Sequence, residues 1–142
     1  MNSGHRIYVS CSRQRLDFDK IVAWTLESYW GHQRTEAQIR ASLQNSTVFG
    51  VFKIEATDRR LTQVGFARII SDHWTSSMIT DVYVDEAFRG QGFGRALMEA
   101  VVEHPSVART LCILGTRDAA GFYRKFGFFD TFSQTMQRNP TP

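Results

Sequence analysis

The chain has 142 residues, enough for one domain with a hydrophobic core and too few for two domains of typical size. Hydrophobic residues make up 42% of it and charged residues 22%, which excludes disordered and fibrous classes. The net charge of +3 suits a small anionic ligand. No run of lysine and arginine is longer than Arg59-Arg60, which argues against a nucleic-acid-binding surface.

The chain contains two cysteines, Cys11 and Cys112, and their spacing predicts neither a disulfide framework nor a metal site. The first residues lack the apolar segment of a signal peptide. No stretch approaches the ~18 apolar residues of a membrane-spanning helix. The sequence therefore predicts a single domain over residues 1–142, in a reduced cytoplasmic setting, with no membrane partner and no bound metal.

The first third of the chain is expected to form a strand and two helices. A strand at Ile7–Val9 precedes a helix that Asp17 caps and that extends to about Tyr29, where Gly31 ends it. Three- and four-residue spacing predicts the buried face of this helix, which comprises Phe18, Ile21, Val22, Thr25, Leu26 and Tyr29. Thr35 begins a second helix with the capping-box pattern.

The middle of the chain is rich in β-branched and aromatic residues. The runs Thr47–Ile54 and Gln63–Ile70 predict a β-hairpin, and Met78–Val84 predicts a third strand. A turn with three glycines follows this strand. An amphipathic helix then begins at once and is expected to stop at Pro105.

The last part is expected to add strands and one short helix. Arg109–Leu114 predicts a strand, and Asp118 is expected to cap a helix that extends to about Lys125. The segments Phe128–Phe132 and Thr135–Arg138 are interpreted as a last pair of strands. The order β-α-α-β-β-β-α-β-α-β predicts an α/β (α+β) domain with one mixed sheet flanked by helices.

The glycine-rich turn is the feature that points most directly to a ligand. Gly90, Gly92 and Gly94 let the backbone approach an anion closely, and the first amides of the following helix have no intrahelical acceptor. Arg89 adds a fixed positive charge. The P-loop and dinucleotide patterns do not fit, because Arg95 stands where each requires a glycine. We interpret the turn as a cradle for a diphosphate.

The pattern Arg89-x-x-Gly92-x-Gly94 resembles the acyl-coenzyme A motif, [QR]-x-x-G-x-[GA], of the Gcn5-related N-acetyltransferases (GNAT). A second stretch, Gly121–Phe128, resembles the tyrosine motif of the same family. The likeness spans most of the chain and looks closest to a compact bacterial-type branch. It implies an N-acetyltransferase that moves an acetyl group from acetyl-CoA directly to a primary amine of a small molecule or peptide.

The resemblance also implies an architecture and an assembly. The strands that contain Val82–Val84 and Arg109–Leu114 are expected to splay apart and open a V-shaped slot for the pantetheine arm. Family members often pair through their sheets, which makes a homodimer an expectation. Three alternatives stay open: a non-catalytic acyl-CoA sensor, a nucleic-acid-binding domain and a protein-interaction module.

The resemblance assigns the cofactor to the motif strand, the glycine turn and the tyrosine motif. The residues expected to contact it are Val82, Tyr83, Val84, Arg89, Gly90, Gln91, Gly92, Phe93, Gly94, Arg95, Thr116, Asp118, Ala119, Phe122 and Tyr123. Many of these contacts involve main-chain atoms, and the N–H of Val82 is the candidate for polarising the thioester carbonyl. Thr116 stands where many family members have an asparagine.

Tyr123 is the candidate proton donor to the departing thiolate. A phenol titrates near pH 10 and an alkyl thiol near 8.5, so proton transfer between them is nearly balanced. The alternative is that the ring only packs among neighbouring phenylalanines.

The general base is not evident from the sequence. Met78 occupies the place where the family often has a glutamate. Asp81 is either a catalytic or substrate-contacting carboxylate or a partner in a structural ion pair. His73 and a bound water are the other candidates for the base.

The acceptor pocket is expected near the end of the first helix, where Tyr29, Trp30 and His32 lie close together in sequence, and His73 is assigned to the same pocket. Ring side chains there can hold an amine by cation–π contact. The alternative is that they cap the hydrophobic core.

Overall fold

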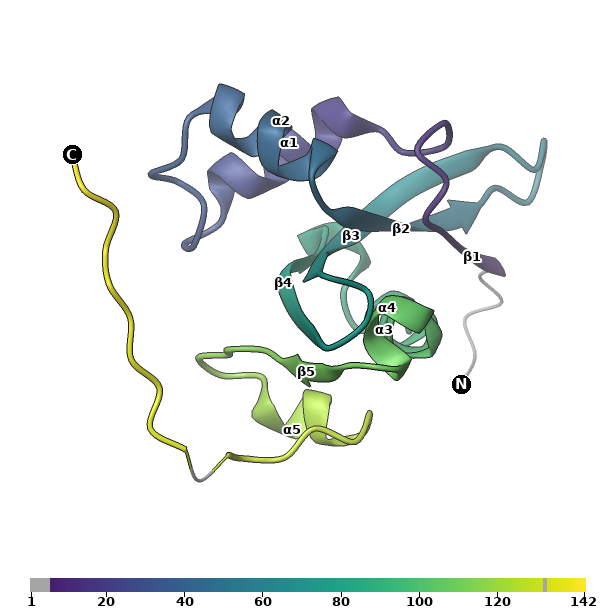
Figure 1. Cartoon of the computed structure of the whole chain (residues 1–142). Coiled ribbons are helices and arrows are strands. Elements are labelled where there is room, and N and C mark those ends of the chain that lie inside the picture. The colour runs from purple at the N-terminus through teal and green to yellow at the C-terminus, as the bar shows by residue number, and fades with distance from the viewer. Residues whose placement is uncertain (1–5, 132) are drawn as a thin grey trace.

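A five-stranded sheet with the order β1-β2-β3-β4-β5 forms the centre of the molecule (Figure 1). The computed structural model describes residues 6–131 and 133–142. The strands are β1 (Arg6–Ser10), β2 (Thr47–Ile54), β3 (Leu61–Ser71), β4 (Ser76–Val84) and β5 (Leu111–Ile113). The helices are α1 (Phe18–Glu27), α2 (Glu36–Gln44), α3 (Phe93–Glu103), α4 (Pro105–Ala108) and α5 (Ala120–Arg124).

The sheet is antiparallel from β1 to β4, and β5 then joins β4 in parallel. The parallel pairing is short, because only Ser76–Met78 of β4 pair with β5. Beyond Met78, the segment Ile79–Val84 has β3 on one side and no β5 partner on the other. The two strands therefore separate toward their carboxyl ends, as expected.

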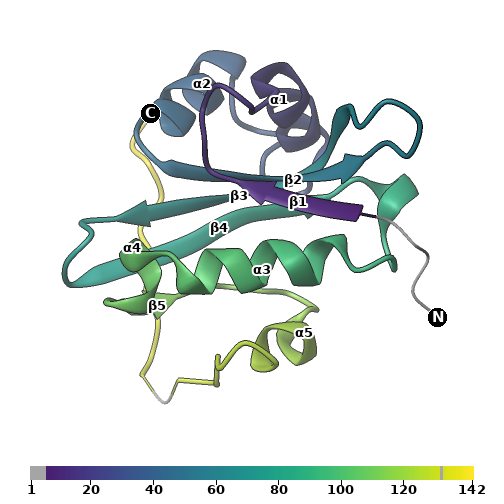
Figure 2. The same cartoon turned by 90° about the vertical axis from the view of Figure 1, so that its right-hand side faces the viewer.

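The helices lie on both faces of the sheet (Figure 2). On one face α3 buries Phe93 and Leu97 against apolar residues of β2, β3 and β4. On the other face α1 and α2 bury Ile21, Trp24 and Leu43 against the opposite side of β2 and β3. This two-sided burial explains why β2 and β3 read as nearly continuous apolar runs.

The first helix begins where the sequence predicts and ends earlier. Asp17 caps it by accepting a hydrogen bond from the N–H of Lys20 at 3.1 Å. It ends at Glu27, because the N–H of Ser28 bonds to two carbonyls of the last turn and its hydroxyl donates to Thr25 at 2.7 Å. Tyr29 therefore leaves the helix with half of its surface exposed, and its assignment to the buried face was wrong.

The second helix and the hairpin agree with the sequence prediction. Thr35 and Gln38 form the reciprocal capping box at the start of α2. The strands β2 and β3 pair antiparallel, with a bulge between Val51 and Phe52. Pro105 follows α3, but it also occupies the first turn of α4, where its missing N–H costs no hydrogen bond.

The carboxyl-terminal end differs from the prediction. The described residues after α5, which leave out Phe132, contain no strand, so the last predicted pair of strands was wrong. Asp118 does not cap α5. Ala119 is the cap residue, and its N–H donates to the hydroxyl of Thr116 at 2.9 Å. Among the described residues, no helix combines the length and apolar character that a membrane crossing requires.

Gly31 makes a close approach that provides a test of the connection between α1 and α2. A Cβ at this position would lie 2.3 Å from the carbonyl oxygen of Thr25. We expect Gly31→Ala to lower the free energy of unfolding by about 1–3 kcal/mol, measured by urea denaturation. The matched control is Gly121→Ala in α5, where a Cβ meets no atom within 4 Å and alanine favours the helix. Equal stabilities of the two variants would contradict the packing described here.

Candidate functional site

The segment between β4 and α3 forms an open turn with a left-handed backbone at two glycines. Asp85 follows β4 and caps a short 3₁₀ turn at Glu86–Phe88. Gly90 and Gly92 then have φ angles of +76° and +91°, which residues with a Cβ adopt only with strain. A Cβ on Gly90 would meet no atom within 4 Å, so the space beside this backbone is open.

The helix α3 begins directly after this turn. Gly92 is the N-cap residue and provides no side-chain acceptor. The first intrahelical bond joins the N–H of Ala96 to the carbonyl of Gly92 at 3.1 Å. A helix of this length, capped by a glycine and beginning beside open space, suits a phosphate group. The glycine turn therefore fits the diphosphate of a coenzyme A.

Arg89 is fixed at the end of β4. Its Nε donates to the carbonyl of Val84 at 2.8 Å, and its guanidinium carbon lies 5.3 Å from the centre of the Tyr83 ring. This hydrogen bond leaves the two terminal nitrogens of Arg89 as its donors for an anion. Val84 is one of the residues expected to contact the cofactor, and its carbonyl accepts this hydrogen bond from Arg89.

The tyrosine motif packs directly against the glycine motif. A Cβ on Gly94 would lie 3.7 Å from Cζ of Phe122 and 3.7 Å from Cγ2 of Val84. The end of β4, the start of α3 and the short helix α5 therefore meet at one point. Two sequence motifs separated by the whole of α3 and β5 lie side by side.

Tyr123 lies in this junction and is half-buried. Its ring makes edge contacts with Phe122 and Phe128, with ring centres 5.2 Å and 6.2 Å away. Burial, together with the nearby Tyr29, raises the pKa of the Tyr123 phenol above its ordinary value of 10. The hydroxyl therefore stays protonated at neutral pH, as a proton donor must.

The middle of β4 contains a bulge. Thr80 pairs with Arg68 and Tyr83 pairs with Phe66, so Asp81 and Val82 both stand opposite one residue of β3. Asp81 has a φ of +53°. The bulge turns the strand at the point where β5 has already separated, next to the Val82 N–H that the sequence proposes as a donor to the thioester.

Asp81 is a buried carboxylate held by two arginines. Its Oδ2 accepts from Nε of Arg68 at 2.7 Å and from Nη1 of Arg34 at 2.9 Å. Burial alone would raise the pKa of Asp81, but the hydrogen bonds and charges of the two arginines outweigh it and lower the pKa. A carboxylate that binds protons so weakly is a poor base. The structure supports the ion-pair alternative over the catalytic one.

The connection between α1 and α2 contacts both β4 and the segment between β5 and α5. The Trp30 ring contacts Tyr83 of β4 edge-on at 6.3 Å. The neighbouring Tyr29 lies under the guanidinium of Arg117, with 3.9 Å between the guanidinium carbon and the ring centre. The indole Nε1 of Trp30 is buried and has no hydrogen-bond partner in the described structure.

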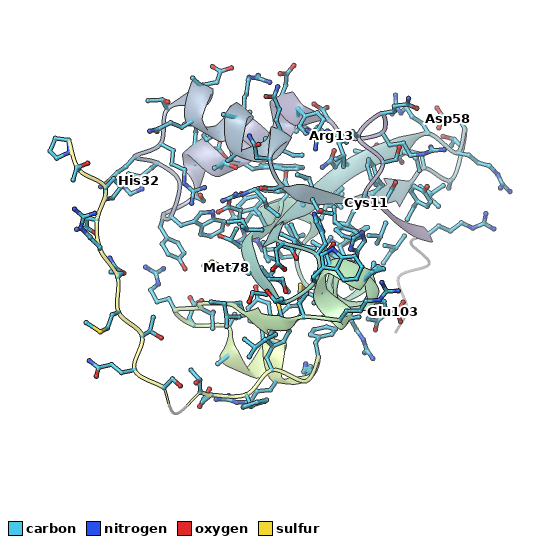
Figure 3. All side chains as sticks on the ribbon, in the orientation of Figure 1. Cys11, Arg13, His32, Asp58, Met78 and Glu103 are labelled. Carbon is cyan, nitrogen blue, oxygen red and sulfur yellow. The ribbon has the colours of Figure 1, made fainter. Side chains whose placement is uncertain are left out.

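Of the two histidines proposed for the acceptor pocket, His32 lies beside Tyr29 and His73 lies elsewhere. The ring of His32 is exposed and its Nδ1 lies 2.9 Å from the carbonyl of Tyr29 (Figure 3). His73 lies in the turn before β4, at the end of that strand opposite the glycine turn, and its Nδ1 is 2.5 Å from Oγ of Ser106. It lines a separate cavity of about 280 Å³ with Ser71 and the end of α2. This position is at the far end of β4 from the glycine turn, and the role of His73 as a base stays a prediction.

The remaining predicted contacts have local partners or lie on the surface. The Gln91 side chain donates to Ala87 at 3.3 Å, and Arg95 pairs with Glu99 at 3.0 Å. Asp118 is exposed, and Ala119 is half-buried at the start of α5. Phe93 is buried in the hydrophobic core under α3.

Sequence reasoning missed three arginines at this site, Arg34, Arg68 and Arg117. Arg68 carried a usable signal, because a charged residue inside an apolar strand needs a buried partner. Arg34 and Arg117 lie in connections that show no periodicity. Their positions follow only from the folded chain.

Comparison with known proteins identifies the family. A model described as "Acetyltransferase (GNAT) domain" matches residues 49–129, more than half of the chain. The chain belongs to the GNAT family. This GNAT domain is therefore of the acyltransferase class, and its fold agrees with that of solved family members.

Relatives of this GNAT chain are found among algal and plant proteins. The N-acetyltransferase ycf52 of Porphyra purpurea is 30% identical over 98 residues, which cover 68% of this chain and 56% of that protein. GCN5-related N-acetyltransferase 1 of Arabidopsis thaliana chloroplasts is 33% identical, with coverages of 68% and 48%. The GNAT chain therefore spans about half the length of the curated relatives it matches.

Crystal structures of bacterial proteins share the fold over nearly the whole chain. A GNAT-family protein from Xanthomonas campestris is 33% identical, has a TM-score of 0.82, and is covered over 94% of its length by 95% of this chain. A probable acetyltransferase from Staphylococcus aureus is 23% identical, with a TM-score of 0.70 and coverages of 95% of this chain and 100% of that one. The second likeness shows the fold alone.

The Asp81 ion pair yields a prediction about stability and pH. Asp81→Asn leaves Arg68 buried with no carboxylate partner, so we expect the free energy of unfolding to fall by about 3–5 kcal/mol in urea denaturation at pH 7. Because the folded pKa of Asp81 is lowered, its stabilisation is present above the unfolded pKa near 4 and is lost as pH falls through the folded value. As the pH is lowered below about 4, the free energy of unfolding should therefore fall less for the variant than for the wild type.

The control for Asp81→Asn is Asp130→Asn. Asp130 pairs with Arg124 at 3.1 Å, and its side chain is 81% exposed. We expect this substitution to change stability by less than about 1 kcal/mol. A similar small effect for Asp81→Asn would show that the ion pair is not required for folding.

Proposed function

We propose that this protein transfers the acetyl group of acetyl-CoA to a primary amine of a small molecule or peptide. The observation that carries the proposal is the contact between Gly94 and Phe122, which brings the acyl-CoA motif and the tyrosine motif together beside the open part of β4. The family supports acetyl-CoA as the donor. Coenzyme A presents a thioester when it is acetylated, and a thioester acylates an amine without an added oxidant or metal.

Each part of the site has a task in this reaction. The amides at the start of α3 and the terminal nitrogens of Arg89 hold the diphosphate. The main chain of β4 beyond Met78 has no β5 partner and is available to orient an extended amide-containing arm. The N–H of Val82 is the candidate donor to the carbonyl oxygen at which negative charge develops.

Tyr123 completes the transfer by giving its proton to the departing sulfur. A C–N bond forms as the C–S bond breaks, the amine loses one proton and the sulfur gains one. An ordinary phenol and an alkyl thiol have similar proton affinities, and the raised pKa of Tyr123 makes this transfer somewhat less favourable. The tyrosine regains its proton from water or from the acylated amine.

A non-catalytic acyl-CoA sensor is the second candidate, and one observation favours it. Met78 stands where the family often has a glutamate, and Asp81 is held in an ion pair, so neither residue offers an evident base. The sensor and the enzyme share the predicted binding of coenzyme A. They differ in whether acetyl-CoA releases thiol when an amine is added.

Arg89 provides a test of cofactor binding. At a concentration one hundred times its Kd, acetyl-CoA or CoA should stabilise the wild type by about 2.7 kcal/mol in a thermal-shift titration, and an oligonucleotide should not. Arg89→Ala should weaken CoA binding by about tenfold or more, because it removes a charge-assisted contact to phosphate. The control is Arg40→Ala, which removes an arginine of α2 that pairs with Asp19 and Glu36 outside the site. Equal CoA affinities of the two variants would place the diphosphate elsewhere.

Tyr123→Phe tests the catalytic assignment. We expect kcat to fall tenfold or more while the affinity for acetyl-CoA stays within about threefold, because only proton donation is lost. The pKa of Tyr123 is raised, so the wild-type kcat should show no decline from loss of this proton below about pH 10. Tyr8→Phe, on β1 against Phe52, is the control and should leave kcat unchanged. A Tyr123→Phe kcat within twofold of wild type would rule out the role.

A further inference from the structure

An uncovered apolar row crosses three strands beside the proposed site. Ile70 of β3 pairs with Met78 of β4, and Met78 pairs with Ile113 of β5. Their exposed fractions are 45%, 39% and 56%, and Leu111 on the same strand as Ile113 is 70% exposed. We call these four residues the apolar row.

The apolar row lies on the face of the sheet that α1 and α2 cover farther along. Ile69 and Ile79 belong to the core under α3, so their strand neighbours Ile70 and Met78 point to the other face. Figure 3 shows Met78 at the open side of β4, between the helices α1 and α2 and the strand β5. The row begins where β4 and β5 separate, so it forms the floor at the apex of the slot.

The wall beside this floor carries an excess of positive charge. Asp81 is one carboxylate with two guanidinium partners, Arg34 and Arg68, which leaves one net positive charge. The Arg68 and Asp81 side chains are 9% and 3% exposed, whereas the Arg34 side chain is 32% exposed. Arg34 therefore has part of its guanidinium available to a ligand, and the uncompensated charge favours an anionic one.

The opposite wall carries a second cation. Arg117 is exposed and stacks on Tyr29, and Tyr29 is close enough to Tyr123 to affect its pKa. The buried Nε1 of Trp30, which has no partner in the described structure, adds an unused donor on the connection that also holds Arg34. Guanidinium and indole groups all donate hydrogen bonds and accept none. The wall groups thus match a carboxylate.

We infer that the acceptor is a primary amine that also carries a carboxylate and an apolar side chain, such as a free amino acid of the leucine or phenylalanine type. The arginines bind the carboxylate, and the apolar row holds the side chain. The inference rests on the proposed acetyl transfer and names the acceptor of that same site. A polyamine or a lysine side chain is disfavoured, because it would bring further positive charge beside Arg34 and Arg117.

The acceptor reacts as the neutral amine, after its ammonium form has lost one proton to water. The neutral amine attacks the thioester, forms the C–N bond and loses its second proton as the C–S bond breaks.

The decisive experiment compares paired amines in a thiol-release assay with saturating acetyl-CoA. L-phenylalanine and 2-phenylethylamine differ only in the carboxylate, as do L-leucine and 3-methylbutylamine, and spermidine serves as a cationic acceptor. We expect kcat/KM to be about 10- to 150-fold higher for the amino acid of each pair, the range for a hydrogen bond to a charged group. Equal values, or a preference for spermidine, would overturn the inference.

Substitutions connect the preference to its residues. Arg34→Gln and Arg117→Gln should each lower the ratio of kcat/KM for L-phenylalanine to kcat/KM for 2-phenylethylamine by about tenfold. A purely structural effect would instead lower kcat/KM for both amines and leave their ratio unchanged. The control is Arg40→Gln, at an arginine on α2 that pairs with Asp19 and Glu36. Met78→Gln should lower the ratio of kcat/KM for L-phenylalanine to kcat/KM for glycine by about tenfold, the range for a lost apolar contact. Met136→Gln, on the exposed tail, is the control and should leave this ratio unchanged.

A binding readout keeps this inference separate from the proposed function. With CoA present, N-acetyl-L-phenylalanine should raise the melting temperature more than N-acetyl-2-phenylethylamine at equal concentration. No thermal shift with CoA would defeat the proposed function. A CoA shift together with equal responses to the two acetylated amines would defeat the acceptor assignment alone.

Discussion

The short pairing between β4 and β5 determines the arrangement of the site. Three residue pairs hold the strands together at Ser76–Met78, and beyond them β4 continues beside β3 alone. The segment that separates from β5 contains the bulge at Asp81 and leads into the glycine turn. Because α5 follows β5, the separation also leaves room for Tyr123 to approach from the other side. A pairing that continued along β4 would close the slot and bury these groups.

The charged and titratable groups along the slot differ from one end to the other, so each part favours a different group of the ligands. At the far end of β4, the start of α3 and Arg89 favour the phosphates. In the middle, two arginines hold the Asp81 carboxylate, which removes it from acid–base work and leaves one positive charge in excess. Near α5, burial keeps the Tyr123 hydroxyl protonated. These effects favour an anionic cofactor and an acceptor that carries an anion.

The sequence predicted the strands, the hairpin and most helix starts, because these depend on local patterns. Asp17 and the Thr35–Gln38 capping box act within one helical turn, so they can be read directly. The glycine turn was predicted for the same reason. The tyrosine motif could be recognised only through the resemblance to a family, since no local rule places α5 against Gly94.

The sequence could not show features that depend on tertiary contacts. The end of α1 follows from the hydrogen bonds of Ser28, and the last predicted strands had apolar residues but found no partner strand. His73 was placed in the pocket from its chemistry, although the direction of β4 takes it to the opposite end of the sheet. Arg34 and Arg117 were missed because their partners, Asp81 and Tyr29, are distant in sequence.

The central claim is that the backbone amides at the start of α3 bind the diphosphate of coenzyme A. The most direct test is an amide NMR titration of the labelled protein with CoA and, separately, with pantetheine, which lacks the diphosphate. The account predicts that CoA alone shifts the amide signals of Gly92, Gly94 and Arg95, while both ligands shift those of Val82 and Tyr83. Unchanged signals at the glycine turn in saturating CoA would contradict it.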